Sequence, residues 1–161
     1  YVEPKILVEE RIECRGNRLP ADYRMHCVEG RVFWVQCITG RGAETTEYIV
    51  DPHGCPLGVQ LNEKLREGVG FGVPEQWSEL KWVAEELAAG FKYVRVDLYA
   101  VNGGVKFGEM TFFPHVGCYR GEGQRVLGQM MDFDRVTVKE PITSGRRVAP
   151  PAVAGARRGS D

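Results

Sequence analysis

The stretch VRVDLYAVNGGVKFGEMTFFPHVG, from Val94 to Gly117, decides the fold. Its first part alternates apolar and polar residues with the period of two that is typical of a strand with one buried face. Asn102-Gly103-Gly104 then forms a turn signal, because Asn and Gly readily adopt positive φ. We therefore expect a β-hairpin in which a three-residue loop joins Tyr93–Val101 to Val105–Phe113.

Asp97 and Glu109 are the informative pair in this hairpin. The three-residue loop would place them opposite each other and Arg95 opposite Thr111, whereas a two-residue loop would send the two acids to opposite faces. Directly opposed like charges are destabilising, and a divalent cation between them removes that penalty. Carboxylates around a cation, with an arginine beside them, suit phosphoryl transfer from a nucleotide. The alternative is that Arg95 neutralises two ordinary surface acids.

Composition places the chain among globular proteins. Its 161 residues are 43% hydrophobic and 27% charged, and the net charge is −1. This balance lacks the basic excess that sequence-independent nucleic-acid binding requires, and no apolar run is long enough to cross a membrane. The five cysteines show no zinc-ligand spacing, so we expect reduced thiols in a cytoplasmic protein.

A first hairpin is expected at Asp22–Val28 and Arg31–Cys37, joined at Glu29-Gly30. This two-residue loop would pair Cys27 with Val32, Met25 with Trp34, and Cys37 with Asp22. Cys27 and Cys37 would then not be opposite each other, which argues against a disulfide. One face would carry Tyr23, Met25, Cys27, Val32 and Trp34.

The helix expected between the hairpins runs from Glu75 to Ala89, with Pro74 at its start and Gly90 just past its end. Its apolar stripe should pack on the second hairpin, and it comprises Trp77, Leu80, Val83, Ala84, Leu87 and Ala88. A shorter helix is expected at Gln124–Met131. Residues 40–73 are expected to form a long irregular loop with one strand at Glu47–Val50. Residues 143–161 are expected to form a disordered tail rich in Pro, Ala and Arg.

The Val94–Gly117 block resembles the end of an ATP-grasp domain, which closes with an R-x-D strand, a hairpin and an E-x-N-x-x-P strand. Thr in place of Asn within Gly108–Pro114 is similar to the TupA-like ATP-grasp family of polysaccharide-biosynthesis proteins. Ile6–Glu10 and Asp22–Val32 also resemble that family. The resemblance covers about Pro4 to Asp134. It implies an α+β fold, the C-terminal subdomain of an ATP-grasp fold, with an antiparallel sheet and a packed helix over residues 1–134.

The resemblance also implies ATP and Mg²⁺ as cofactors. Asp97 and Glu109 would ligate Mg²⁺ that bridges the phosphates of ATP. Thr111 replaces the usual Asn ligand and would coordinate more weakly or through water. Arg95 would be the catalytic residue, facing the transferring phosphate and stabilising developing negative charge.

Further contacts follow from the same resemblance. The backbone of a hinge strand would meet the adenine edge, and this strand comprises Glu9, Glu10, Arg11 and Ile12. Asp22 would bond ribose hydroxyls, and Arg41 is a weaker candidate for a phosphate contact. His115-Val116-Gly117 departs from the family's P-G-x-G pattern, so His115 is either a substrate contact or an ordinary loop histidine.

The function implied is an ATP- and Mg²⁺-dependent carboxylate–amine ligase in cell-surface polysaccharide biosynthesis, acting on a small-molecule or glycan-precursor substrate. The alternatives are a glycosyl- or phosphotransferase of the same pathway and a degenerate binding module without catalysis. The fold's glycine-rich phosphate loop and its lysine are expected upstream of Tyr1, so this chain alone is expected to be inactive. An exposed strand at Glu3–Glu10 would form an open sheet edge and favour self-association.

Overall fold

The computed structural model describes residues 3–6, 8–12, 19–40, 42–117, 119 and 122–130. Its strands are β1 (Asp22–Val28), β2 (Arg31–Thr39), β3 (Thr46–Val50), β4 (Arg66–Glu67), β5 (Tyr93–Val101) and β6 (Gly104–Thr111). Its helices are α1 (Trp77–Ala88) and α2 (Glu122–Met130), with 3₁₀ turns at Gly42–Glu44 and Pro114–Gly117. α1 begins two residues later than predicted, α2 begins two residues earlier, and β6 ends before Phe112.

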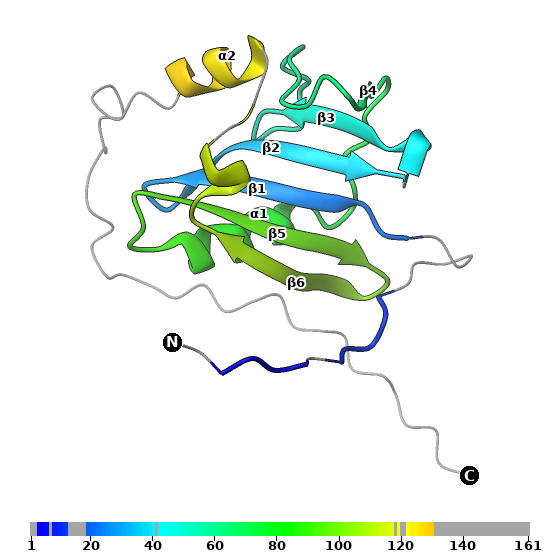
Figure 1. The fold of residues 1–161 in the computed structure, drawn as a ribbon, viewed down its shortest axis with the longest axis vertical. Helices are drawn as coiled ribbons and strands as arrows, with labels where there is room; N and C mark the ends of the chain where they lie inside the picture. The colour runs from blue at the N-terminus through cyan, green and yellow to red at the C-terminus, as the bar shows by residue number, and fades with distance from the viewer. Residues whose placement is uncertain are drawn as a thin grey trace.

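The strands form one sheet in the order β4-β3-β2-β1-β5-β6. Neighbouring strands are antiparallel except for the short parallel pair of β3 and β4. Figure 1 shows α1 behind the sheet, while the chain after β6 returns across the front towards α2. The predicted α+β fold, an antiparallel sheet with a packed helix, is confirmed.

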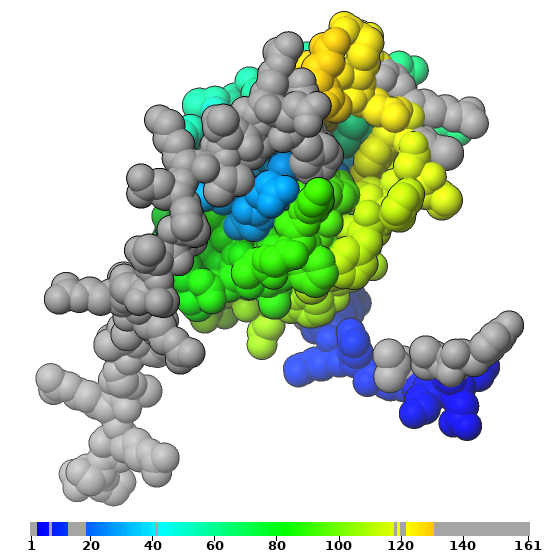
Figure 2. All heavy atoms as spheres, turned by 90° about the vertical axis from the view of Figure 1, so that its left-hand side faces the viewer, coloured from blue at the N-terminus to red at the C-terminus, as the bar shows by residue number. Residues whose placement is uncertain are grey.

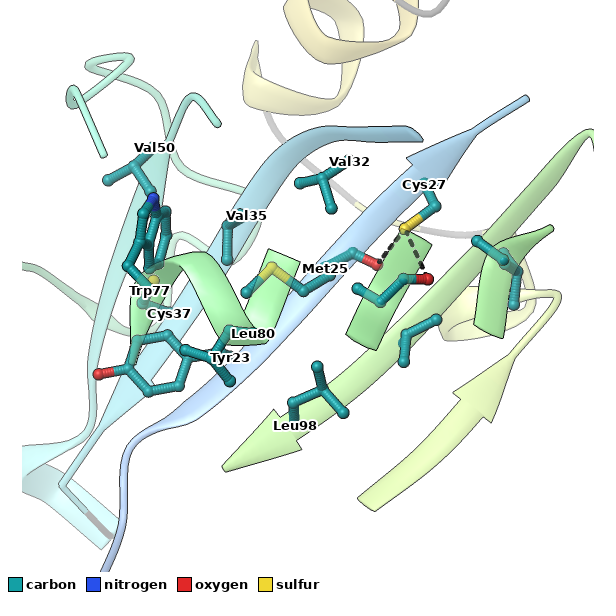
Figure 3. Packing of buried hydrophobic residues seen from close by; sticks show 14 residues of the cluster. Tyr23, Met25, Cys27, Val32, Val35, Cys37, Val50, Trp77, Leu80 and Leu98 are labelled. Atoms are coloured by element: carbon teal, nitrogen blue, oxygen red, sulfur yellow. Dashed lines mark hydrogen bonds between the residues drawn. The ribbon is translucent and has the colours of Figure 1, made fainter. Parts of the chain in front are cut away.

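The core lies between α1 and the sheet (Figure 3). The stripe of α1 supplies Trp77, Leu80, Ala84 and Ala88, all buried, whereas Leu87 is 36% exposed. These side chains meet alternate residues of β1 and β5, namely Tyr23, Met25, Cys27, Val94, Val96 and Leu98. Burying one face of the helix and one face of the sheet together is the main stabilising contribution in a fold of this kind.

The first hairpin turns at Glu29-Gly30 with φ of 49° and 73°, the positive values that a two-residue turn requires. Cys27 pairs with Val32 as predicted, but the register shifts at the next residue because Phe33 is an extra residue in β2. The predicted pairs of Met25 with Trp34 and of Cys37 with Asp22 are therefore wrong.

The bulge moves Trp34 to the face of the sheet that is opposite α1. Met25 pairs with Val35 instead, and Cys37 pairs with Tyr23, so Val35 and Cys37 join the core. Trp34 packs with a second group of buried residues that includes Leu127 of α2. Cys27 and Cys37 are free thiols, so the expectation of no disulfide in this hairpin is confirmed.

The second hairpin reaches the predicted pairing by a different route. Its turn has two residues, because Gly104 already pairs with Val101. A β-bulge then inserts Gly108 between the partners of Leu98 and Asp97. The extra residue provides the one-residue shift that a longer loop was expected to provide, so Asp97 pairs with Glu109 and Arg95 with Thr111, as predicted.

Gly108 has no room for a side chain. A Cβ there would lie 2.9 Å from the carbonyl oxygen of Asp97 and 3.0 Å from the ring of Tyr99. We expect Gly108→Ala to lower the free energy of unfolding by about 1 to 3 kcal/mol, because the backbone of β5 must move. Urea unfolding checks this, with Gly72→Ala as the control, since a Cβ at Gly72 meets nothing within 4 Å. Equal stabilities of the two variants would contradict the tight bulge.

The prediction of a strand near the N-terminus is wrong for the part that the structure describes. Residues 3–6 and 8–12 belong to no strand, and Ile6 and Val8 are 93% and 92% exposed. Figure 2 shows this segment projecting from the body of the molecule. An apolar run forms a strand only where a neighbouring strand completes its backbone hydrogen bonds, and the run itself does not reveal that neighbour.

Three other expectations are not tested by the structure. Self-association stays a prediction, and Arg41 and residues 143–161 lie outside the described residues.

Candidate functional site

The face of the sheet opposite α1 is buried but polar. Strand alternation that sends apolar residues to α1 sends polar ones here. Six polar or charged side chains on this face are at most 5% exposed: Asp22, His26, Gln36, Glu47, Arg95 and Asp97. Buried groups of this kind need partners, since an unpaired charge in a protein interior is strongly unfavourable.

Arg95 is the centre of an ionic cluster on β5 and β6. Its Nε and Nη2 donate to the two carboxylate oxygens of Asp97, both at 2.7 Å. Nη2 also donates to Glu109 Oε1 at 2.7 Å and to Thr111 Oγ1 at 3.1 Å. The side chains of Arg95 and Asp97 are 6% and 5% exposed, whereas that of Glu109 is 63% exposed. The cluster is therefore closed at Asp97 and open to solvent at Glu109.

Asp22 joins this cluster through Arg24. Arg24 Nε donates to Asp22 Oδ2 at 2.8 Å and lies 3.8 Å from Asp97 Oδ2. Burial raises the pKa of the Asp97 carboxyl to about 6, while the hydrogen bond and the charge of Arg95 act in the opposite direction. Two carboxylates and two guanidinium groups thus share one partly dehydrated region of the sheet.

The structure brings together five of the predicted site residues. Arg95, Asp97, Glu109 and Thr111 are in direct contact, and Asp22 is linked to them by Arg24. The predicted hinge residues lie instead in the exposed segment outside the sheet, and they are Glu9, Glu10, Arg11 and Ile12.

The oxygen ligands of the cluster suit a hard cation. Mg²⁺ in nucleotide sites is held by one or two carboxylates, with phosphates and water completing the shell. Asp97 and Glu109 supply two carboxylates, and Thr111 supplies a hydroxyl. Among the described residues, no group of three or more His, Cys, Asp or Glu forms a metal site by itself. These residues therefore fit a cation that shares its shell with a phosphate, and they do not form a closed metal cage.

The turn after β6 has an unusual backbone. His115 and Val116 have φ of 49° and 54°, a conformation that favours glycine and is rare for a β-branched residue. His115 stands where the family pattern has glycine, and its ring lies 4.7 Å from that of Tyr119. Strained backbone of this kind is concentrated at sites that bind ligands.

The sequence interpretation missed a second buried polar group beside the cluster. His26 stacks on Trp34 with ring centroids 3.4 Å apart, and Gln36 bonds the fully buried Glu47. The alternation Asp22, Arg24, His26 along β1 was a usable signal, because it continues the polar face. The bulge that brings Trp34 to this face left no signal that we recognised.

The chain can be compared with known proteins through its fold and through its sequence. The fold and the acidic pair at its last hairpin fit the C-terminal part of an ATP-grasp domain. The family model described as TupA-like ATPgrasp matches residues 1–132, so the chain belongs to this family. The searches of curated proteins and of solved structures found no match. Neither helix in the described part of the chain is long and apolar enough to span a membrane.

Arg95 should be essential for stability. Arg95→Ala would leave the buried Asp97 carboxylate without its guanidinium partner, so we expect the free energy of unfolding to fall by about 3 to 5 kcal/mol. Urea unfolding measures it. Arg125→Ala is the matched control, because Arg125 also pairs with an acid, Glu122, but both side chains are exposed, at 60% and 69%. Little change in Arg95→Ala would contradict the closed cluster.

Proposed function

We propose that this chain carries the ATP- and Mg²⁺-binding half of a carboxylate–amine ligase. One observation supports this most directly: Arg95, Asp97 and Glu109 meet on one face of two adjacent strands. Membership of an ATP-grasp family supports ATP and Mg²⁺ as the cofactors. The bulge at Gly108 matters here because it keeps both acids on that face.

Each residue of the cluster has a role in this proposal. Asp97, Glu109 and Thr111 hold Mg²⁺, which supplies charge neutralisation to the phosphates of ATP. Thr111 is the weakest of the three ligands, because a neutral hydroxyl binds a hard cation less strongly than a carboxylate. Arg95 stabilises negative charge on the transferring phosphoryl group and on the acyl phosphate. Its position between the two acids keeps the guanidinium charged and oriented in a site from which water is partly excluded.

Two further parts of the chain would contact the nucleoside. Asp22 bonds the ribose hydroxyls, and its burial beside the cluster supports a place near the nucleotide. The backbone of the exposed segment meets the adenine edge, through Glu9, Glu10, Arg11 and Ile12. This segment would pack against the nucleotide when it binds.

The reaction activates a carboxylate as an acyl phosphate, which an amine then attacks. The substrate would be a small molecule or glycan precursor of a cell-surface polysaccharide, as the resemblance to the TupA-like family implies. The free thiols of Cys27 and Cys37 and the use of ATP are compatible with a cytoplasmic location.

One observation favours the second candidate, a binding module without catalysis. Arg95 already contacts both Asp97 oxygens and one Glu109 oxygen, so it neutralises the acids that a cation would need. Thr111 in place of the Asn that usually closes an ATP-grasp domain weakens the metal site further. In this case the cluster would be a structural ion pair.

Titration of Mg·ATP into the chain distinguishes the two functions. For the ligase we expect heat of binding in the unmodified chain and its loss in Asp97→Asn and Glu109→Gln. Glu109→Gln is the more informative variant, because Glu109 is the exposed member and its loss should leave the fold intact. Glu63→Gln, an exposed acid away from the cluster, is the matched control and should bind normally.

Unchanged binding in both Asp97→Asn and Glu109→Gln would refute the metal assignment, and no heat in the unmodified chain would favour the binding module. Product analysis of reactions with ATP, Mg²⁺ and candidate acceptors then separates the possible activities. ADP with phosphate fits a ligase, ADP with a phosphorylated sugar fits a kinase, and no use of ATP fits a glycosyltransferase.

A further inference from the structure

A cavity of about 600 Å³ lies beside the ionic cluster, between the end of β6 and α2. This volume suits a small organic molecule. Most of its lining is aromatic or aliphatic, and the members used below are Trp34, Tyr93, Phe112, Tyr119 and Lys92. Lys92 is the charged residue among the described lining residues, so the cavity has a cation at its rim and no acid.

Tyr93 is tied to a line of buried polar side chains that crosses four strands. Its hydroxyl lies 2.8 Å from His26 Nδ1, and Gln36 Nε2 donates to Glu47 Oε1 at 2.6 Å. Tyr93, His26, Gln36 and Glu47 lie on β5, β1, β2 and β3 and are diagonal neighbours in the sheet register. Long side chains reach one another at such diagonal positions. We call these four residues the buried relay.

The hydrogen bonds of Glu47 determine how the side-chain amide of Gln36 is oriented. Glu47 Oε2 accepts from the backbone N–H groups of Leu61 and Asn62, and Oε1 accepts from the amide nitrogen of Gln36. The amide of Gln36 is therefore oriented with its nitrogen towards Glu47, which leaves Oε1 on its other side. An amide oxygen only accepts hydrogen bonds.

His26 is the next residue of the relay. Gln36 Oε1 and His26 Nε2 are both buried, and neither has a hydrogen-bond partner among the described residues. These two unpaired atoms of neighbouring side chains would suit each other if the ring carries its proton on Nε2, because the amide oxygen only accepts. Gln36 also favours the protonated form of His26. Burial, with the charges of Arg95 and Arg24, lowers the pKa of His26 well below its ordinary value, so the ring is neutral. In the tautomer with the proton on Nε2, the ring has a bare Nδ1, which accepts the hydrogen bond from the Tyr93 hydroxyl. In that tautomer the hydroxyl proton of Tyr93 is directed at His26, and the oxygen keeps lone pairs that can accept a further bond.

We propose that the cavity binds a ring-shaped ligand that carries an anionic group and a hydrogen-bond donor, and that Tyr93, oriented by the buried relay, selects the donor. The aromatic lining contacts the ring, and Lys92 attracts the anion. The ring of Trp34 lines this wall and stacks on His26 of the relay. This site is additional to the nucleotide cluster and goes beyond the proposed ligase function.

The test uses the intact chain without nucleotide, so its result is independent of the Mg·ATP titration. The probes are 4-hydroxybenzoate and 4-methoxybenzoate, which differ in the donor, and 4-hydroxybenzamide, which lacks the charge. We expect 4-hydroxybenzoate to bind about fivefold more tightly than the methoxy compound by NMR titration, as one neutral hydrogen bond allows. Tyr93→Phe should reduce this ratio to about one. Tyr48→Phe is the matched control, because its hydroxyl bonds Val69 instead, and it should keep the ratio.

Three results would overturn the proposal. One is the absence of probe binding, and another is a preference for the hydroxy compound that persists in Tyr93→Phe, because the bulk of the methoxy group would then explain it. The third is independent of any ligand: ¹⁵N spectra of the unmodified chain must show the His26 proton on Nε2, and a proton on Nδ1 contradicts the relay.

Lys92→Met tests the anion contact separately. This variant should remove the preference for 4-hydroxybenzoate over the benzamide, and the exposed Lys64→Met should keep it. An unchanged preference in Lys92→Met would contradict the role of Lys92.

Discussion

The β-bulge at Gly108 is the constraint on which the site depends. Side chains alternate between the faces of a strand, so one extra residue in β6 decides to which face Glu109 and Thr111 point. With it, both meet Arg95 on the polar face. Without it, the two-residue turn would pair Asp97 with Gly108 and direct Glu109 towards α1. The close approach of the backbone at Gly108 keeps this register in place.

The two faces of the sheet bury different kinds of side chains. Its α1 face is apolar and stabilises the fold through packing, while its other face buries charges that are stable only because they are paired. Arg95 and the buried relay lie side by side on this polar face, since His26 pairs with Arg95 across β1 and β5. The proposed nucleotide cluster and the neighbouring cavity would therefore share one rigid support, which favours two ligands held close together.

Much of the architecture was predictable from local pattern. The turn at Glu29-Gly30 and the buried stripe of α1 follow from turn chemistry and periodicity. The pairing of Asp97 with Glu109 was predicted from a three-residue loop, whereas a two-residue turn and the bulge at Gly108 produce it. The bulges at Phe33 and Gly108 were not predicted, because an extra residue leaves the apolar pattern of a short strand almost unchanged. The relay was missed for the same reason, since its members come from four strands whose register depends on a bulge. The strand predicted at the N-terminus failed because it depended on a partner that periodicity does not reveal.

The central claim is that the cluster of Arg95, Asp97 and Glu109 binds a divalent cation together with a nucleotide. Paramagnetic relaxation with Mn²⁺ tests it most directly, because Mn²⁺ takes the oxygen ligands of Mg²⁺ and broadens the NMR signals of nearby amides. With ATP present, substoichiometric Mn²⁺ should first broaden the amides of Asp97, Glu109 and Thr111. Broadening that begins at exposed acids such as Glu63, with those three amides unaffected, would contradict the account.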